Sequence, residues 1–350
     1  MLSLHACRNG RLVTVDVDQL KPAALPDASV DATTAPAPAS EIVWMDLLNP
    51  SPDDVKRVEG RLGIAIPTRD EMAEIELSNR LYSEDGAEFM TMTAIVDADG
   101  EPTKSALTFI LKGDCLVTVR HADSRPFAHY MHTEQRGIAG SATSGEHVMM
   151  GLLEAIIDRV ADVLERVGDE TDAISRGVFR NKRSNVTKKT GDLQSLIEQI
   201  GAKGDLLSKL RESLISIGRL AAYHNAAGAA RPAPVAKGKA KAKKEARERL
   251  KLIQRDAASL AEHAVFLSSK ITFLLDATLG LINLEQNQII KIFSVAAVVF
   301  LPPTLVASIY GMNFEIMPEL QWSFGYPYAL ALMVASAIVP YLFFKRKGWL

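Results

Sequence analysis

The sequence predicts an α+β cytosolic domain that is joined by long helices to two transmembrane helices at the C-terminal end. In the first half of the chain, short apolar segments alternate with turn residues, as is typical of strands. From residue 144 the spacing of apolar residues becomes helical. The last 60 residues hold two long uncharged apolar stretches, which carry most of the excess hydrophobicity.

Charge is distributed unevenly along the 350 residues. Overall, 40 lysines and arginines nearly balance 42 acidic residues, and a net charge of −2 argues against nucleic-acid binding driven by bulk charge. Residues 1–100 nevertheless hold 18 acidic and 8 basic side chains, whereas residues 231–255 hold 10 basic and 2 acidic ones. Cys7 and Cys115 lie in no metal-spaced pair and cannot form a disulfide framework, which favours a reducing compartment.

The N-terminal α/β domain is expected to span residues 1–143. Ser51 is expected to cap a helix, because Pro52 occupies the first helical position and acidic residues follow it. The Ala/Pro/Thr-rich segment 22–40 is expected to be a disordered insertion. Lys112-Gly113-Asp114 predicts a hairpin turn between two strands. Strands are expected at 12–17, 42–47, 88–96, 106–111 and 116–120.

Residues 144–242 are expected to form paired cytosolic helices, at 144–179 and 192–223, followed by a basic linker. A third helix is expected to start near Lys243 and to continue unbroken to Tyr310. Its 68 residues would span about 100 Å. A solvated linker is the favoured interpretation of the basic stretch; anionic lipid, an electrostatic role at the cytosolic surface and nucleic acid are alternatives.

The stretches 292–310 and 324–344 contain 19 and 21 residues without a charge. A helix needs about 20 apolar residues to cross the hydrocarbon core of a bilayer, so both are predicted to span a membrane. Lys345, Arg346 and Lys347 follow the second span, whereas the loop 311–323 between the spans has no basic residue. The positive-inside rule then places both termini in the cytoplasm. The start of the chain has no signal-peptide pattern.

Small and polar residues follow a 3.5-residue repeat along the helix that enters the first span. Such a repeat is typical of parallel helix bundles, and a polar face suits a ring of helices around a water-filled axis. Two alternatives remain: the asparagines could lie in water outside the bilayer, and serine or threonine could bond the carbonyl four residues back. The Pro302-Pro303 pair inside the span suggests a bend. The repeat consists of Asp276, Gly280, Asn283, Asn287, Ile290, Ser294, Ala297, Leu301, Thr304 and Ser308.

Tyr310-Gly311-Met312-Asn313-Phe314 ends the first span and precedes EIMPELQWSFGYP. Together with FSVAAVVFLPPTLVASIYGMNF and the basic ending KRKGWL, it resembles the signature of the CorA-type magnesium and cobalt transporters. The resemblance is strongest over residues 250–350. It implies a funnel-shaped homopentameric channel in which residues 243–310 form a stalk helix continuing into the first span. Residues 311–323 would be a periplasmic loop, and 324–350 the second span with a cytosolic tail.

By this resemblance, Gly311, Met312 and Asn313 form the selectivity filter. Mg²⁺ loses its water reluctantly, so a filter can hold the hydrated ion with neutral carbonyl oxygens such as that of Asn313. Glu315 and Glu319 would concentrate cations at the outer mouth. Asp276, Asn287 and Thr304 fall at pore positions, with Ile290 and Leu301 as hydrophobic constrictions.

The resemblance also implies that intracellular Mg²⁺ closes the channel by bridging carboxylates of neighbouring cytosolic domains. Asp97, Asp99 and Asp256 are the candidates for this regulatory site. The expected function is Mg²⁺ influx across the inner membrane, with Co²⁺ and Ni²⁺ as further ions, and no resident cofactor. No Walker-type glycine loop is present, so no ATP hydrolysis and no enzymatic activity are expected.

Two alternatives to a magnesium channel stay open. A zinc-transporting relative is disfavoured by Met312, because such relatives tend to vary the middle residue of the tripeptide. A non-conducting membrane-anchored scaffold or sensor would not need the polar repeat. The expected partners are therefore Mg²⁺, Co²⁺, the lipid bilayer and further copies of the chain, and not nucleic acid.

Overall fold

The computed structural model describes residues 1–8, 11–16, 42–98, 101–135, 144–180, 186–230, 237–313 and 317–348. The expected insertion 22–40, Asp99 and Glu315 lie outside these ranges, and of Glu319 only the backbone is described. The chain divides into two compact units. The N-terminal unit comprises 1–175 and 199–272, and the C-terminal unit comprises 176–198 and 273–350.

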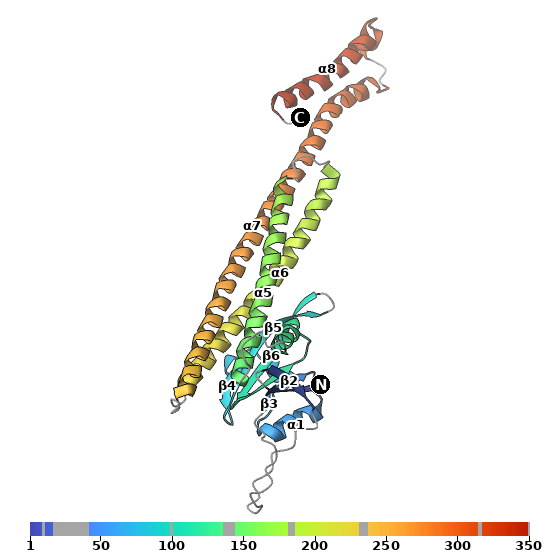
Figure 1. Ribbon diagram of the computed structural model, residues 1–350. Helices are drawn as coiled ribbons and strands as arrows, with labels where there is room; N and C mark the ends of the chain where they lie inside the picture. Colours follow the sequence, from blue (N-terminus) through green and yellow to red (C-terminus); the bar gives the residue numbers. More distant parts are fainter. Residues whose placement is uncertain are drawn as a thin grey trace, which may run out of the picture. The chain divides into compact units, whose positions relative to one another are not determined.

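The described part of the N-terminal unit is built on a seven-stranded sheet (Figure 1) with the order β2-β1-β3-β7-β6-β5-β4. Neighbouring strands are antiparallel except for β3 and β7, which pair in parallel. The strands are β1 (Leu2–Arg8), β2 (Arg11–Val15), β3 (Ile42–Leu48), β4 (Leu81–Glu84), β5 (Ala87–Ala98), β6 (Glu101–Lys112) and β7 (Cys115–Arg120).

All five expected strands are confirmed as β2, β3, β5, β6 and β7, and the hairpin turn lies between Lys112 and Cys115. Gly113 adopts a φ of 60°, which favours glycine. The sequence did not predict β1 and β4. In β1 the apolar residues Leu2, Leu4 and Ala6 alternate with Ser3 and His5 as in a strand, and this signal was overlooked. The other strand, β4, has only four residues, none of them fully buried.

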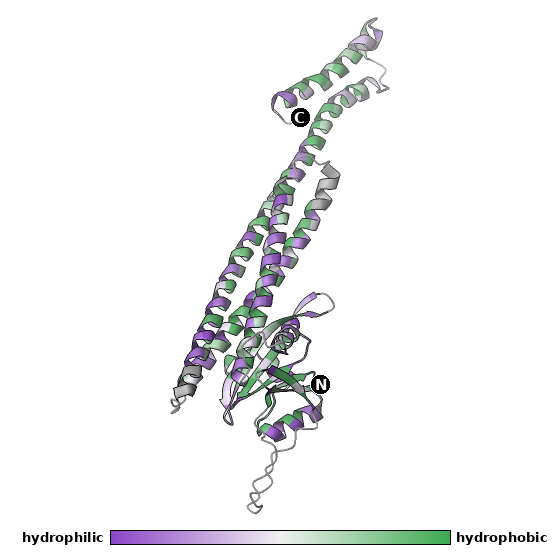
Figure 2. Ribbon diagram, viewed as in Figure 1, coloured by the Kyte–Doolittle hydropathy of each residue, from purple (hydrophilic) through white to green (hydrophobic). Residues whose placement is uncertain are grey.

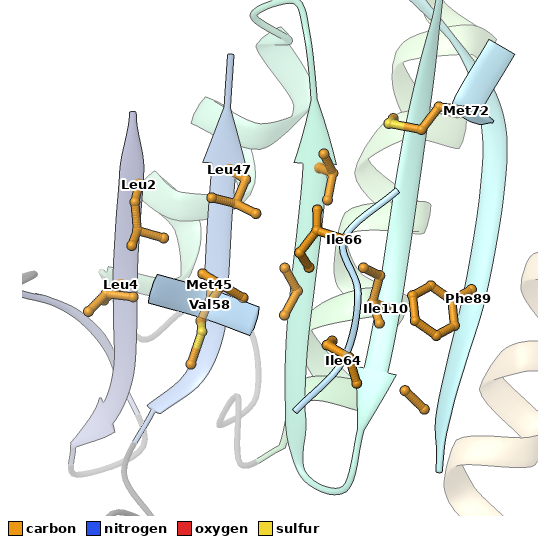
Figure 3. Close-up of a cluster of buried hydrophobic side chains, with 13 residues drawn as sticks. Leu2, Leu4, Met45, Leu47, Val58, Ile64, Ile66, Met72, Phe89 and Ile110 are labelled. Atoms are coloured by element: carbon orange, nitrogen blue, oxygen red, sulfur yellow. The ribbon is translucent and has the colours of Figure 1, made fainter. Parts of the chain in front are cut away.

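One face of the sheet is covered by α1 (Pro52–Leu62) and the segment that follows it, as Figure 3 shows. Val58 of α1 is fully buried, and Ile64 and Ile66 extend the same apolar cover. Burying side chains of this size contributes about 1.5–3 kcal/mol each. The sheet side of this core is formed by Leu2, Leu4, Met45, Leu47, Phe89, Ile110, Val117 and Val119, with Met72 from α2 (Arg69–Ala73) beside them.

The start of α1 confirms the expected cap. The Ser51 hydroxyl accepts a hydrogen bond from the backbone N–H of Asp54 at 3.2 Å, and the Asp54 carboxylate accepts one from the N–H of Ser51 at 3.1 Å. These bonds satisfy donors that the first helical turn leaves free. At the other end Gly63 takes a left-handed conformation and its N–H bonds the Glu59 carbonyl at 2.7 Å.

Trp44 of β3 packs against α4 (Arg125–Gln135), with its ring centroid 6.0 Å from that of Phe127 and 6.2 Å from that of Tyr130. Next to α4 lies α5 (Gly145–Arg180), where the backbone of Gly151 approaches the Tyr130 ring. A Cβ at Gly151 would lie 2.3 Å from Tyr130 Cε2, so this contact requires glycine.

Two further long helices follow, α6 (Val186–Ala230) and α7 (Lys237–Tyr310). Both are longer than expected: α6 extends beyond 192–223, and α7 begins before Lys243. The prediction of a linker up to residue 242 was therefore wrong for residues 237–242, which are helical. The alanines, lysines and arginines of the basic stretch are strong helix formers, and this propensity carries the helix into it.

In the N-terminal unit, α7 buries one apolar face at alternating steps of three and four residues. The spacing is the 3.5-residue repeat of packed parallel or antiparallel helices. Ion pairs join the helices at the edge of this face, between Arg249 of α7 and Glu154 of α5 and between Lys203 of α6 and Glu170 of α5. The buried residues are Ala246, Leu250, Ile253, Ala257, Ala264, Leu267 and Ile271.

The C-terminal unit contains the ends of α5, α6 and α7, a short 3₁₀ helix (Pro318–Gln321) and α8 (Gly325–Arg346). Phe179 of α5 stacks near Phe273 of α7, with 6.3 Å between the ring centroids. Figure 2 shows that α8 and the last part of α7 are mostly apolar. In each helix only 6% of the most apolar 18-residue segment is buried, and both helices are long enough to cross a membrane.

Candidate ion pathway

The polar repeat forms one continuous face of α7 in the C-terminal unit. The helix is unbroken from 273 to 310, so steps of three and four residues keep all its members on one side. Each member is exposed within the single chain; Ile290 and Leu301, for example, are 61% and 65% exposed. From Asp276 to Ser308 this face extends about 48 Å along the helix.

Residues of α7 that are buried within the chain in the C-terminal unit lie off the polar face. Thr278 and Val295 are buried, and neither belongs to the repeat. Positions two residues apart are about 200° apart around a helix, so Thr278 lies opposite Asp276 and Gly280. The polar face is therefore left uncovered by the chain's own helices, as expected for a face that meets either water or another copy.

Apolar side chains flank the polar face and are equally exposed. Phe293 and Phe300 are 72% and 71% exposed. Exposure alone thus does not separate the two surfaces of the helix, but their chemistry does: one is suited to lipid or a neighbouring helix, the other to water.

Thr304 uses its hydroxyl proton within the helix. Its Oγ1 donates to the Phe300 carbonyl at 2.7 Å, the back-bond that was one alternative for the repeat. Pro302 and Pro303 donate no backbone hydrogen bond, yet α7 continues through both, so the suggested bend does not interrupt the helix. With its proton turned to Phe300, the Thr304 oxygen has lone pairs left to face the polar side, which suits a cation or its water shell.

The Gly-Met-Asn motif ends α7 with a tight turn. The N–H of Gly311 bonds the Ala307 carbonyl at 2.9 Å, and the N–H of Met312 bonds the Ile309 carbonyl at 3.3 Å. A Cβ at Gly311 would lie 3.1 Å from the Ala307 oxygen, a close approach that favours glycine. Asn313 follows directly and is exposed. Asn313 therefore lies five residues beyond Ser308, the last member of the polar face.

Aromatic residues lie where the second span begins. The rings of Trp322 and Tyr328 have centroids 5.9 Å apart, and Tyr326 is 77% exposed. Such side chains favour the membrane–water interface. At the other end of α8, Lys345 and Arg346 form the basic last turn. The ends of α8 thus carry the two kinds of residue that anchor a span.

The described regulatory candidates lie in the N-terminal unit. The Asp97 carboxylate is 3.4 Å from Arg125 Nη2 and 3.7 Å from Arg159 Nη2. Asp256 is exposed on α7, and its charge adds to burial, Glu154 and Asp162 in raising the pKa of Asp158. Within the residues that the structure describes, no group of three or more His, Cys, Asp or Glu is arranged to hold a metal ion.

The sequence interpretation missed a buried charge cluster in the N-terminal unit. His224 of α6 lies between two carboxylates, with its Nδ1 2.6 Å from Glu88 Oε2 of β5 and its Nε2 3.1 Å from Glu146 Oε1 of α5. Burial lowers the pKa of His224, but the hydrogen bonds to Glu146 and Glu88 outweigh this and raise the pKa to about 9. The signal in the sequence was Glu88, a charged residue next to Phe89 and Met90 near the start of a predicted strand.

A second missed cluster ties β3 to β7. The Arg120 guanidinium donates to Asp46 Oδ2 at 2.8 Å and stacks over the Phe127 ring at 4.5 Å. Thr118 donates to the same carboxylate at 2.7 Å. Because these groups are buried and mutually paired, they fix the one parallel strand pair of the described sheet.

Two apolar spans, the first with a polar face that ends in Gly-Met-Asn, define a two-span membrane transport protein. Residues 39–346 match the family described as CorA-like Mg²⁺ transporter protein. The chain belongs to this family, which is one of transporters and not of enzymes.

Relatives are similar over their full length. The magnesium transport protein CorA of Escherichia coli (strain K12) is 35% identical over 353 residues, and that of Pectobacterium atrosepticum is 36% identical over 351 residues. Each alignment covers 100% of both chains. The complete structure of the CorA magnesium transporter from Methanocaldococcus jannaschii matches with a TM-score of 0.74 and 18% identity, over 100% of this chain and 99% of that one. This last match shows a shared fold.

Proposed function

We propose that this chain transports Mg²⁺ across a membrane through a channel lined by the polar face of α7. The observation that carries the proposal is the uncovered polar face, which ends in Gly311-Met312-Asn313 on an apolar spanning helix. Full-length similarity to magnesium transport proteins supports Mg²⁺ as the ion. Co²⁺ and Ni²⁺ are proposed as further permeant ions.

A pore requires several copies, because two spans cannot enclose one. We propose a homopentamer in which the polar faces of five α7 helices meet around an axis. The apolar flanks, including Phe293 and Phe300, would contact neighbouring helices and lipid. Asp276 and Asn287 would then form polar rings below the hydrophobic constrictions of Ile290 and Leu301.

Selectivity is proposed to arise from neutral oxygen ligands that act on a hydrated ion. Mg²⁺ holds its water tightly, and five Asn313 amides offer carbonyl oxygens to that water shell without the strong binding of a carboxylate ring. The Thr304 oxygens offer lone pairs deeper in the pore. Glu315 and Glu319 would raise the cation concentration at the outer mouth.

The proposed location is the inner membrane, with both termini in the cytoplasm. The basic end of α8 supports this orientation through the positive-inside rule. The membrane potential would then drive influx, contributing about 2.3 kcal/mol per elementary charge per 100 mV.

Intracellular Mg²⁺ is proposed to close the channel by binding acidic residues between neighbouring copies. Such a ligand shifts the equilibrium only if it binds the closed state more tightly. Asp256 is exposed and available, whereas Asp97 would exchange its contacts with Arg125 and Arg159 for the ion. If Asp256→Ala leaves the dependence of current on internal Mg²⁺ unchanged, Asp256 is not part of this site.

Uptake into liposomes that contain a Mg²⁺-sensitive dye tests the proposal. Wild-type protein should take up Mg²⁺, and Asn313→Ala should reduce the rate by about tenfold or more, since each copy loses its filter amide. Asn225→Ala, a change of the same type in the N-terminal unit, should leave the rate unchanged. Native mass measurement should give five copies.

Two results would contradict the proposal. Well-folded oligomers that take up no ion would favour the scaffold or sensor alternative. Uptake of Zn²⁺ without Mg²⁺ would favour the zinc-transporting alternative.

A further inference from the structure

A cavity of about 460 Å³ in the N-terminal unit is lined by three arginines. Arg80 reaches it from α3 (Leu77–Arg80), and Arg211 and Arg219 reach it from α6. Hydroxyl groups complete the polar lining, among them that of Ser268 on α7. A cavity of this size is in the range of small-molecule sites.

The arginines of the cavity are not neutralised by carboxylates. Arg80 donates to the Glu74 carbonyl at 2.7 Å and to the Thr93 hydroxyl at 3.4 Å, contacts that hold it in place and leave its charge uncompensated. Arg211 and Arg219 make no hydrogen bond or ion pair with the residues that the structure describes. The acidic residue of the lining, Glu212, is bound to Lys104 at 2.8 Å. The cavity therefore attracts anions.

A second hollow, of about 340 Å³, adjoins the first between α6 and α7. The two share Arg211, Ile215 and Val265 in their linings, so they are adjacent and are together called the groove. The floor of the second hollow is small and apolar, with Gly218 on α6 and Ala261 on α7. Two polar side chains, Gln254 and Glu262, also line it.

The spacing of the arginines indicates more than one phosphoryl group. Arg211 and Arg219 are eight residues apart on α6, so their backbone positions are about 12 Å apart along the axis and about 80° apart around it, and both line the cavity. Guanidinium groups bind phosphate oxygens in pairs, and a row of them matches a row of phosphoryl groups. The hollow next to Arg211, with its small apolar residues, has the chemistry that accepts a planar ring, and the Gln254 amide and the Glu262 carboxylate are available for the polar edge of that ring.

We propose that this groove binds a nucleoside di- or triphosphate, with the phosphates on Arg80, Arg211 and Arg219 and the base between α6 and α7. The site lies within the N-terminal unit and contains none of the residues proposed for ion conduction. Its occupancy is therefore measurable apart from transport.

Equilibrium binding of a fluorescent N-methylanthraniloyl ADP to the full-length protein in nanodiscs tests the proposal, at fixed free Mg²⁺. Binding should be saturable and displaced by ADP and ATP, more weakly by inorganic tripolyphosphate, and not by adenosine. Arg211→Gln and Arg219→Gln should each weaken it by about tenfold or more, because each removes charge-assisted hydrogen bonds to phosphate. Arg57→Gln, an exposed arginine of α1 outside the groove, is the matched control.

A second variant separates the nucleotide from free polyphosphate. Ala261→Phe fills the apolar hollow, so it should weaken displacement by ADP and leave displacement by tripolyphosphate unchanged. Circular dichroism and native mass would verify that each variant folds and assembles. Absence of saturable binding would overturn the proposal, as would equal losses in Arg57→Gln and Arg211→Gln. Tripolyphosphate that competes as well as ATP, together with a harmless Ala261→Phe, would overturn the base-binding half and leave a simple polyphosphate site.

Discussion

The helix α7 runs through both units, and the regular face that it presents is apolar and buried in one unit and polar and exposed in the other. In the N-terminal unit α7 buries an apolar face that includes Leu250, Ala257 and Leu267. In the C-terminal unit most of its apolar side chains are exposed, and the regular face carries small and polar residues such as Asn287 and Thr304. Both faces nevertheless follow the same 3.5-residue repeat.

The difference reflects the solvent on each side of the helix. In water, burial of apolar area drives packing, so the repeat selects leucine, isoleucine and alanine for the inner face. In a bilayer the surroundings are already apolar, and the costly groups are the polar ones, which must face protein or water. The same 3.5-residue repeat can thus mark either a buried apolar face or an exposed polar face, and the residue types at the repeat positions show which of the two it is.

The largest expected effect comes from placing a charge on the buried face of the N-terminal unit. Ala257→Asp should lower the free energy of unfolding by about 3–5 kcal/mol, because Ala257 is fully buried and the new carboxylate would be removed from water on folding. The neighbouring Ala258 is exposed, so Ala258→Asp should change the free energy of unfolding by about 0.5 kcal/mol or less. Chemical denaturation of the full chain in detergent measures both. Equal losses would mean that the face is not buried.

In the C-terminal unit, the effect of a substitution to aspartate should depend on which face of α7 carries it. Phe300→Asp places a charge on an apolar flank and should make insertion of the first span less favourable by about 3–4 kcal/mol. Leu301→Asp, on the polar face, should be better tolerated in the assembled protein and should alter the rate of Mg²⁺ uptake. Glycosylation-based insertion assays and liposome flux measure the two effects. If both variants fail to assemble, the polar face does not meet water.

Local signals allowed much of the fold to be predicted from the sequence. The cap at Ser51 and the turn at Gly113 depend on residues three or fewer positions apart, and the polar repeat lies on one helix. Each of these features can therefore be recognised from a short segment of sequence. The start of α7 was misplaced because alanine and lysine suit both a helix and a solvated linker.

Features that depend on distant partners were not predicted. His224 meets Glu88 and Glu146, which are 136 and 78 residues away in sequence. The groove likewise depends on the packing of α6 against α7, because only this packing brings Arg211 of α6 and Ala261 of α7 to line the same hollow. A charged residue in an apolar strand signals that a partner exists but not which one it is.

The N-terminal unit contains buried charged side chains, such as Glu88 and Arg120, and the described part of the C-terminal unit contains none. Its one buried polar side chain is that of Thr278. In the N-terminal unit the pKa of His224 is raised from 6.5 to about 9. Its pairing with Glu88 and Glu146 should therefore stabilise the unit fully below pH 6.5. This stabilisation, about 3 kcal/mol, should be lost as the pH rises through 9. His224→Gln should flatten the dependence of unfolding free energy on pH between 6 and 10. An unchanged pH profile would show that the imidazole is not charged in the folded state.

The smallest expected effect concerns how helices begin in the two units. Ser51 caps α1 with a side-chain bond, whereas Phe324 starts α8 with none. Ser51→Ala should lower the free energy of unfolding by about 1 kcal/mol, because the N–H of Asp54 loses its acceptor. Ser269→Ala is a suitable control, since that hydroxyl only bonds the Val265 carbonyl within α7. A loss in the control as large as that in Ser51→Ala would mean that the cap contributes nothing specific. A clear difference would show that water-exposed α1 depends on its cap.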